Sequence, residues 1–349
     1  MKRLTLRKKQ ETRKPERITN DTVGEHRKRV LAGGRKFKYP IQYSRHKLVI
    51  NTIIISVLAL IATGVFGWWQ LSPQQNTGTF AYRVTSVLPV SVANVGGETV
   101  RYSDYLLKLR SAEHYLERKE QTVLGDDNAE QRTYLKQQAM RDAIADAYAL
   151  GIAREQGITV SDEELAIFLK DKRLIEGSEI TERTQQAVIR DYYGWSPDEY
   201  AHVMRIKLLR QKVAYHIDGT AKSRADGVRD VVMKASQRVS WQDLIKARGA
   251  EWSDMQYGIS GMVPRTNQDG GLAVAAAGLE EQAISGIVQV TADNEYYYAI
   301  IRLLDSNKTQ VNYEFILVPA VEFQRRLNEQ YDKGGVHVLI DVPLKKEGE

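Results

Sequence analysis

The chain has 349 residues, no cysteine and a formal net charge of +6. Without cysteine it has no disulfide bond and no cysteine-linked lipid anchor, so its folded parts must be held by their own cores. The charge is uneven, because residues 1–47 hold 16 Lys or Arg against four acids, and the other residues hold 34 against 40.

Residues 1–47 form a basic segment with a net charge of +12. Its scattered apolar residues and few aromatics favour a disordered tail that stays on the cytoplasmic side and is attracted to lipid headgroups. Such a tail is also compatible with nucleic-acid binding. The scarcity of aromatic rings for stacking on bases argues against a nucleic-acid partner.

The segment from Leu48 to Trp69 is almost entirely apolar, and no charged residue occurs between Lys47 and Arg83. As a helix it spans about 33 Å, enough to cross a hydrocarbon core of about 30 Å. The long preceding segment and the lack of a cleavage site disfavour a signal peptide, and the length of the uncharged run disfavours a core helix. We expect a single span in the cell membrane, with the amino terminus inside and the later domains extracytoplasmic.

Residues 70–90 are expected to form a linker and the start of a first strand. The stretch LSPQQNTGTFAY is polar and contains Gly and Pro, as linkers do. The valine-rich run from Val84 to Val95 is typical of a β-strand. Gly96 and Gly97 then predict a two-residue turn into a second strand at Glu98 to Arg101.

Four or so helices are expected after this hairpin. The first should begin at a Ser103 cap and reach about Lys119, and the longest should cover 129–156 and end at Gly157. Two capping boxes, each with an apolar staple, mark later helix starts and consist of Ser161 with Glu164, and of Ser196 and Pro197 with Glu199. The last of these helices should end near Ala214.

Three motifs in this region stand in a familiar order. They are VANVGGETVRYSDYLLKL, then MRDAIADAYALGIAREQGITVSDEELAIFLKDKR, then YGWSPDEYAHVMRIKLLRQKVA. Residues 91–215 thereby resemble the amino-terminal chaperone domain of the SurA and PrsA foldases of bacterial envelopes. The resemblance implies a mostly helical domain that binds unfolded polypeptides.

From Val213 the pattern changes to short strands and helices. Six landmarks follow in order, namely YHI, SWQDL, GISG, LAVAAAGL, AISG and YAIIRL. Residues 216–305 thereby resemble a parvulin prolyl-isomerase domain, of the PpiC or rotamase type, which follows the helical domain in that family. The resemblance implies an α+β domain whose first strand opens at Tyr215 to Ile217.

The resemblance also implies a catalytic site with two histidines and an acid between them. His216 matches the first histidine, Asp254 supplies the acid after a gap in the alignment, and Ser285 matches the serine before the last strand. Ala299 stands where the second histidine belongs. The matched residues therefore make an incomplete set.

For the substrate pocket, the resemblance places Leu272 at the position of a phenylalanine and suggests Leu279 and Met262 as further apolar contacts. Ser260 and Gln268 stand where Leu and Met occur, so the proline ring loses apolar area, each Å² being worth about 25 cal/mol. Isomerisation needs such a pocket rather than a nucleophile or a metal. We expect a degenerate site, with an active peptidyl-prolyl isomerase as the alternative. The scattered histidines predict no metal site, and no cofactor is expected.

Residues 306–349 predict a strand at 311–319, a helix near 321–330 and a strand at 336–342. In SurA-like proteins the carboxyl segment returns to complete the chaperone module, and the resemblance implies the same here.

Taken in order, these elements predict an α+β chain with one transmembrane helix, a helical chaperone domain and a parvulin-like domain. The expected function is that of a membrane-anchored, extracytoplasmic chaperone whose partners are unfolded, translocated polypeptides. An envelope interaction scaffold is a further alternative, because the span and the basic tail would serve it equally.

Overall fold

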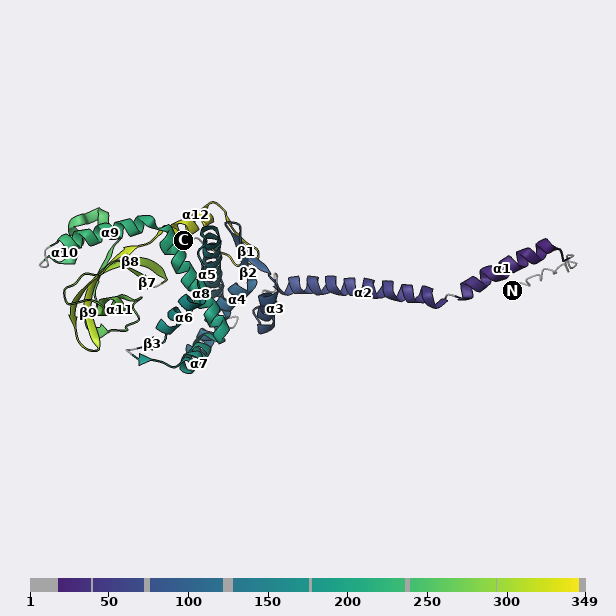
Figure 1. Ribbon diagram of the computed structural model, residues 1–349, viewed down its shortest axis with the longest axis horizontal. Coiled ribbons are helices and arrows are strands. Elements are labelled where there is room, and N and C mark those ends of the chain that lie inside the picture. Colours follow the sequence, from purple (N-terminus) through teal and green to yellow (C-terminus); the bar gives the residue numbers. More distant parts are fainter. Residues whose placement is uncertain are drawn as a thin grey trace, which may run out of the picture. The chain divides into compact units, whose positions relative to one another are not determined.

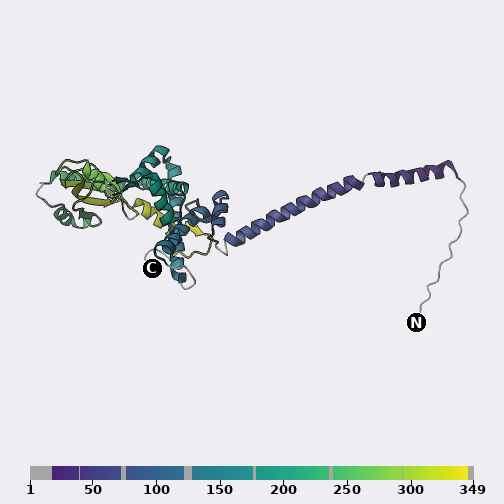
Figure 2. The same cartoon turned by 90° about the horizontal axis from the view of Figure 1, so that it is seen from below.

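The computed structural model describes residues 18–38, 40–71, 76–121, 128–175, 178–235, 239–292 and 294–344 (Figures 1 and 2). The chain divides into two compact units, residues 1–69 and residues 70–349. Helices alternate with antiparallel strands in the second unit, so the predicted α+β class is confirmed.

Helix α1 covers Asn20–Lys38. The disorder expected for residues 1–47 is therefore wrong for this stretch, and residues 1–17 lie outside the described chain. The reason is local: the Thr19 backbone N–H donates to the Thr22 hydroxyl at 2.9 Å, and Asp21 stands in the first turn, where a carboxylate favours a helix start.

Helix α2 runs continuously over Pro40–Leu71 and includes the predicted span (Figure 1). Its part His46–Leu71 is long and apolar enough to cross a membrane. The apolar side chains of this part, such as Ile55 and Leu60, are exposed rather than packed in a core. A helix satisfies all its backbone groups internally, so the same segment suits a lipid environment.

The second unit begins with a set of helices around one short sheet. The elements are α3 (Thr79–Val87), β1 (Ser91–Val95), β2 (Glu98–Arg101), α4 (Tyr102–Lys119), α5 (Ala129–Gln156), α6 (Asp162–Asp171), β3 (Leu174–Ile175), β4 (Ser178–Glu179), α7 (Glu182–Tyr193) and α8 (Pro197–Ile217). Strand β1 pairs antiparallel with β2 around Gly96 and Gly97, both at positive φ, as predicted.

The first strand was expected too early. Residues 79–87 form helix α3 instead, and only Ser91–Val95 is extended. Ala81 and Thr85, one helical turn apart, are buried on the side that packs on α4, and the Thr85 hydroxyl donates to the Ala81 carbonyl at 2.8 Å. Burial of that spacing outweighs the weak strand preference of valine and threonine.

The predicted helix ends are largely confirmed. Gly157 ends α5 at φ +67°, and both capping boxes form, at Ser161 with Glu164 and at Ser196 with Glu199. Ser103 is a wrong assignment, because α4 begins one residue earlier and Ser103 is buried inside its first turn. Caps are local interactions, which explains why sequence identifies most of them.

Helix α8 continues to Ile217, so the strand expected at Tyr215 to Ile217 does not form. Tyr215 is buried, and its hydroxyl lies 2.7 Å from the Val290 carbonyl oxygen and 3.2 Å from that of Tyr297. Helix α8 therefore places the Tyr215 side chain against the following sheet, at the position where a strand was expected.

The following elements build the larger sheet with its helices. They are α9 (Gly219–Lys234), α10 (Trp241–Arg248), η2 (Gly249–Trp252), β5 (Gln256–Ile259), β6 (Val263–Pro264), α11 (Leu272–Ala277), β7 (Val288–Ala292), β8 (Glu295–Ser306) and β9 (Gln310–Pro319). The order is β5-β9-β8-β7, with β6 also paired to β9 and all pairs antiparallel. Since β9 lies inside this sheet, the predicted domain boundary at 305 is wrong.

Each face of the larger sheet has its own core. Alternate residues of β8, such as Tyr298 and Ile300, pack with Trp241 on the side of α9 and α10. Their neighbours Tyr297 and Ala299 pack on the side of α11, and Figure 1 shows these helices on opposite sides of the sheet.

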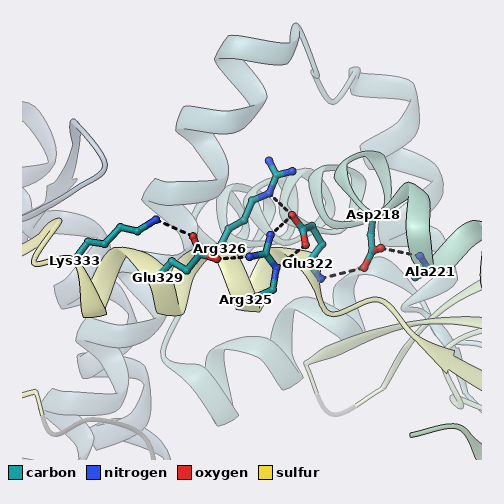
Figure 3. Close-up of polar contacts among 7 residues, drawn as sticks. All are labelled: Asp218, Ala221, Glu322, Arg325, Arg326, Glu329 and Lys333. Atoms are coloured by element: carbon teal, nitrogen blue, oxygen red, sulfur yellow. Dashed lines mark hydrogen bonds and ion pairs between the residues drawn. The ribbon is translucent and has the colours of Figure 1, made fainter. Parts of the chain in front are cut away.

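The carboxyl segment returns to the first helices through α12 (Glu322–Asp332) and β10 (Val336–Val338), which pairs antiparallel with β1. The buried Asp218 joins this segment to α9. Its Oδ1 accepts from the Ala221 N–H at 2.8 Å and its Oδ2 from the Glu322 N–H at 3.0 Å (Figure 3). One carboxylate thus caps two helices.

Replacing Asp218 should destabilise the second unit. We expect Asp218→Ala to lower the free energy of unfolding by about 2–4 kcal/mol, because two N–H groups lose a charged acceptor. Asp218→Asn keeps one acceptor oxygen and should cost about half as much. The measurement is urea unfolding of the detergent-solubilised chain, followed by tryptophan fluorescence. The control is Asp226→Ala on α9, an exposed partner of Lys222, and equal losses for Asp218→Ala and this control would refute the double cap.

Glu322 should make stability depend on acid pH. Hydrogen bonds from Arg325 and Arg326 lower the pKa of Glu322 from 4.5 to about 2 (Figure 3). Its contribution is therefore complete above pH 4.5 and disappears as the pH falls towards 2. Since the arginines are largely exposed, we expect at most about 1 kcal/mol.

The test compares urea unfolding across that pH range for the natural chain and Glu322→Gln. The variant should show a flatter pH profile, whereas Glu163→Gln, at an exposed carboxylate of α6, should follow the natural chain. An unchanged profile in Glu322→Gln would contradict the assignment.

Candidate functional site

The three predicted catalytic residues lie on different elements and have separate partners. His216 is exposed in the last turn of α8. Asp254 is exposed after η2, and both its oxygens accept from Arg224, at 2.6 Å and 2.9 Å. These hydrogen bonds lower the pKa of Asp254 and keep it an ion-pair partner rather than a proton donor.

Ser285 is buried beside β8. Its hydroxyl accepts from the Ile301 N–H at 3.0 Å and donates to the Gly286 carbonyl at 2.6 Å. It thereby satisfies a backbone N–H of β8 that a neighbouring strand would otherwise bind. Within the described chain, no hydrogen bond or ion pair joins Ser285, His216 and Asp254 to one another. The structure does not assemble them into one catalytic set.

The predicted pocket residues are brought together only in part. Leu272 is buried and Leu279 half-buried in the core between α11 and the sheet, where Ala299 also lies. Met262, by contrast, is 41% exposed beside β6. Leu272 and Leu279 therefore serve packing, and the position of the expected second histidine is filled by a methyl group inside the core.

Sequence reasoning missed Asp269, which organises this side of the sheet. Its carboxylate accepts from the Tyr313 hydroxyl at 2.5 Å, the Asn267 amide at 3.0 Å and the Ala273 N–H at 3.0 Å. Burial, then the Asp269 bond, raises the pKa of Tyr313. The hydrogen bonds of Asp269 therefore hold the fold together. The residues that the structure describes contain no cluster of three metal-ligating side chains.

A different feature stands out on the helices, where aromatic rings gather around the end of α7. We call Tyr115, Tyr192, Tyr193 and Trp195 the aromatic surface. Tyr115 of α4 and Tyr192 of α7 are 6.4 Å apart between ring centroids and are 38% and 42% exposed. Lys119 lies over the Tyr192 ring at 4.2 Å and pairs with Asp191.

The second half of the aromatic surface is held by the turn between α7 and α8. Tyr193 stacks on Trp195 with 4.8 Å between centroids, and Trp195 faces Tyr200 at 6.4 Å, which is the predicted staple. The Trp195 indole N–H donates to the Leu107 carbonyl at 3.4 Å. Two helices and a capped turn therefore fix these rings while leaving part of them in solvent.

Such a surface has a definite chemical capacity. Partly exposed tyrosines offer large apolar area, a hydroxyl for hydrogen bonds and little side-chain entropy to lose on binding. It suits the apolar and aromatic side chains of an extended polypeptide. Among the described residues, the aromatic surface belongs to no group of three metal-ligating side chains.

Comparison with known families bears on these helices. Residues 41–214 match the family model of the SurA-like N-terminal domain. The match confirms the SurA-like resemblance of this part of the sequence. No match was found among curated proteins.

The SurA-like domain spans α2 to α8 and so contains the apolar helix as well as the aromatic surface. A SurA-like domain of this kind implies binding of unfolded polypeptides. The motif YGWSPDEY, which carried the resemblance, also supplies Tyr193, Trp195 and Tyr200. Its aromatic content was thus visible in sequence, but the approach of Tyr115 from α4 was not.

His216 should be dispensable. Because it is exposed on a helix end, we expect His216→Ala to change the free energy of unfolding by less than about 0.5 kcal/mol. We also expect no change in isomerisation of a proline-containing peptide. The comparison is Ser285→Ala, which removes the acceptor of a buried N–H and should cost about 1–2 kcal/mol. A loss of isomerase activity specific to His216→Ala would restore the catalytic assignment.

Proposed function

We propose that this chain is a membrane-anchored chaperone that binds unfolded, translocated polypeptides on the extracytoplasmic side. The observation that carries the proposal is the SurA-like match over residues 41–214, within which the aromatic surface is rigidly held and partly exposed. Binding by apolar contact needs no chemical step, and the rings of the aromatic surface supply such contact.

Anchoring is supported by α2. Its part His46–Leu71 is long and apolar enough for a span, and its side chains are exposed. The family match begins at residue 41, ahead of this part, so one family model covers the apolar helix and the helices after it. That continuity favours a retained span over a cleaved signal peptide. The basic residues of α1 favour a cytoplasmic amino terminus.

Holding an unfolded chain requires contacts that are numerous and individually weak. An aromatic pair contributes about 0.5–1.5 kcal/mol beyond the burial of its area. A few rings on a fixed surface therefore bind an extended segment reversibly, and a client can leave to fold.

We further propose that the larger sheet is a parvulin-like unit without isomerase activity, which serves the chaperone framework. Arg210 of α8 donates to the Tyr296 hydroxyl at 2.9 Å, and the Gln268 amide donates to the Leu174 carbonyl at 2.5 Å. These contacts, far apart in sequence, tie the sheet to the helices at two places. His216, Asp254 and Ser285 contribute no shared site.

The test changes the rings of the aromatic surface. In the double variant Tyr115→Ser/Tyr192→Ser we expect affinity for an unfolded client peptide to fall about fivefold to thirtyfold, since each lost ring contact is worth about 0.5–1 kcal/mol. Suppression of client aggregation should weaken in parallel. Fluorescence anisotropy with labelled peptide measures the first effect and light scattering the second.

The matched control is Tyr115→Phe/Tyr192→Phe, which keeps both rings and should retain binding. Equal behaviour of the Ser and Phe variants would contradict the proposal. A scaffold is separated by client breadth, because it would capture one or two defined partners and ignore unrelated unfolded chains.

A further inference from the structure

Helix α3 has one buried side and a second side with exposed apolar residues. Ala81 and Thr85 are buried on the side that packs on α4. Phe80 and Val87 are 81% and 79% exposed, and with Val84 between them they follow the i, i+4, i+7 spacing of one helix face. We call Phe80, Arg83, Val84 and Val87 the outer face of α3.

An outer face of this kind is unusual on a helix that already has a packed side. Single exposed apolar residues are common, but a short helix that is apolar on both sides is typical of one with a second apolar environment. Arg83 belongs to the same outer face and is exposed. A cation beside an apolar stripe matches the boundary between acyl chains and anionic headgroups.

The last two residues of α2, Gln70 and Leu71, belong to the second unit. The Tyr102 hydroxyl donates to the Leu71 carbonyl at 3.1 Å, and Leu71 packs against the core of the second unit. The Asn76 N–H and its side-chain amide both donate to Gln70, each at 3.0 Å. Gln70 and Leu71 are therefore held within the second unit, which also contains α3.

Chain length adds to this constraint. Only residues 72–78 separate α2 from α3, and such a segment reaches about 25 Å at most when fully extended. If α2 spans a bilayer, α3 lies within reach of its surface. We propose that the outer face of α3 lies in the headgroup region of the bilayer beside the span, with Phe80 and Val87 directed to the acyl chains.

This inference rests on the proposed anchoring by α2 and adds a second membrane contact. With a single span as its only membrane contact, the second unit is free to change its orientation relative to the bilayer. A lipid-bound α3 restricts that motion and holds the aromatic surface in one orientation relative to the bilayer. The alternative occupant of the same face is an unfolded client, which the experiment distinguishes.

The absence of cysteine allows a direct test with single labels in the full chain. Phe80→Cys and Val87→Cys are labelled with an environment-sensitive dye and reconstituted in vesicles of phosphatidylcholine and phosphatidylglycerol. We expect a blue-shifted emission and several-fold protection from iodide. Ile167→Cys on α6, 63% exposed in the natural residue, carries the same dye and should stay accessible. Ile55→Cys reports on the span.

Each outcome decides the matter. Labels at 80 and 87 protected together with 55, but not 167, support the contact. Labels at 80 and 87 as accessible as 167, with 55 protected, overturn it while the anchoring stands. An accessible label at 55 overturns the anchoring and this inference together. Protection at 80 that needs unfolded client and occurs equally in detergent assigns the face to the client and also overturns the inference.

Discussion

The second unit depends on the burial of Tyr215 at the end of α8. A buried tyrosine hydroxyl needs a partner, and this one lies within hydrogen-bond distance of carbonyl oxygens in both β7 and β8. Burial raises the pKa of Tyr215 to about 12, so the hydroxyl remains a donor throughout the physiological range. Because α8 must stay helical to place this side chain, no strand can start at residue 215. Strands β9 and β8 are the inner strands of the sheet, and the carboxyl segment returns through α12 and β10.

Charged groups at the same junction fix the helices against the sheet. Asp146 of α5 accepts from Lys108 at 2.6 Å and Arg210 at 3.2 Å, and Arg210 reaches on to Tyr296. Within the sheet, the buried pair Arg302 and Glu314 lies beside Trp241. Such pairs cost desolvation and add little net stability, but breaking one leaves a buried charge. They favour one arrangement of helices and sheet, and with it a fixed aromatic surface.

The functional reading follows from this rigidity. The residues that a catalytic comparison singles out are occupied elsewhere: Asp254 binds Arg224, Ser285 completes a strand contact, and Ala299 fills the core. Apolar or aromatic side chains are left partly in solvent at the end of α7 and on the outer face of α3. This arrangement and the SurA-like domain agree with the proposed function, in which the chain holds other molecules at its surface.

The sequence by itself determined what neighbouring residues decide. The apolar helix, the glycine turn at Gly96 and Gly97, the end of α5 at Gly157 and the two capping boxes depend on contacts within a few residues. Tertiary structure decided whatever depends on distant partners. Residues 79–87 are helical because α4 buries one side of them. Helix α8 extends beyond its expected end because Tyr215 is buried against the sheet, and Tyr115 of α4 contacts Tyr192 of α7. Local preferences amount to about 1 kcal/mol per residue at most, whereas burying one large side chain is worth about 1.5–3 kcal/mol, so packing prevails wherever the two conflict.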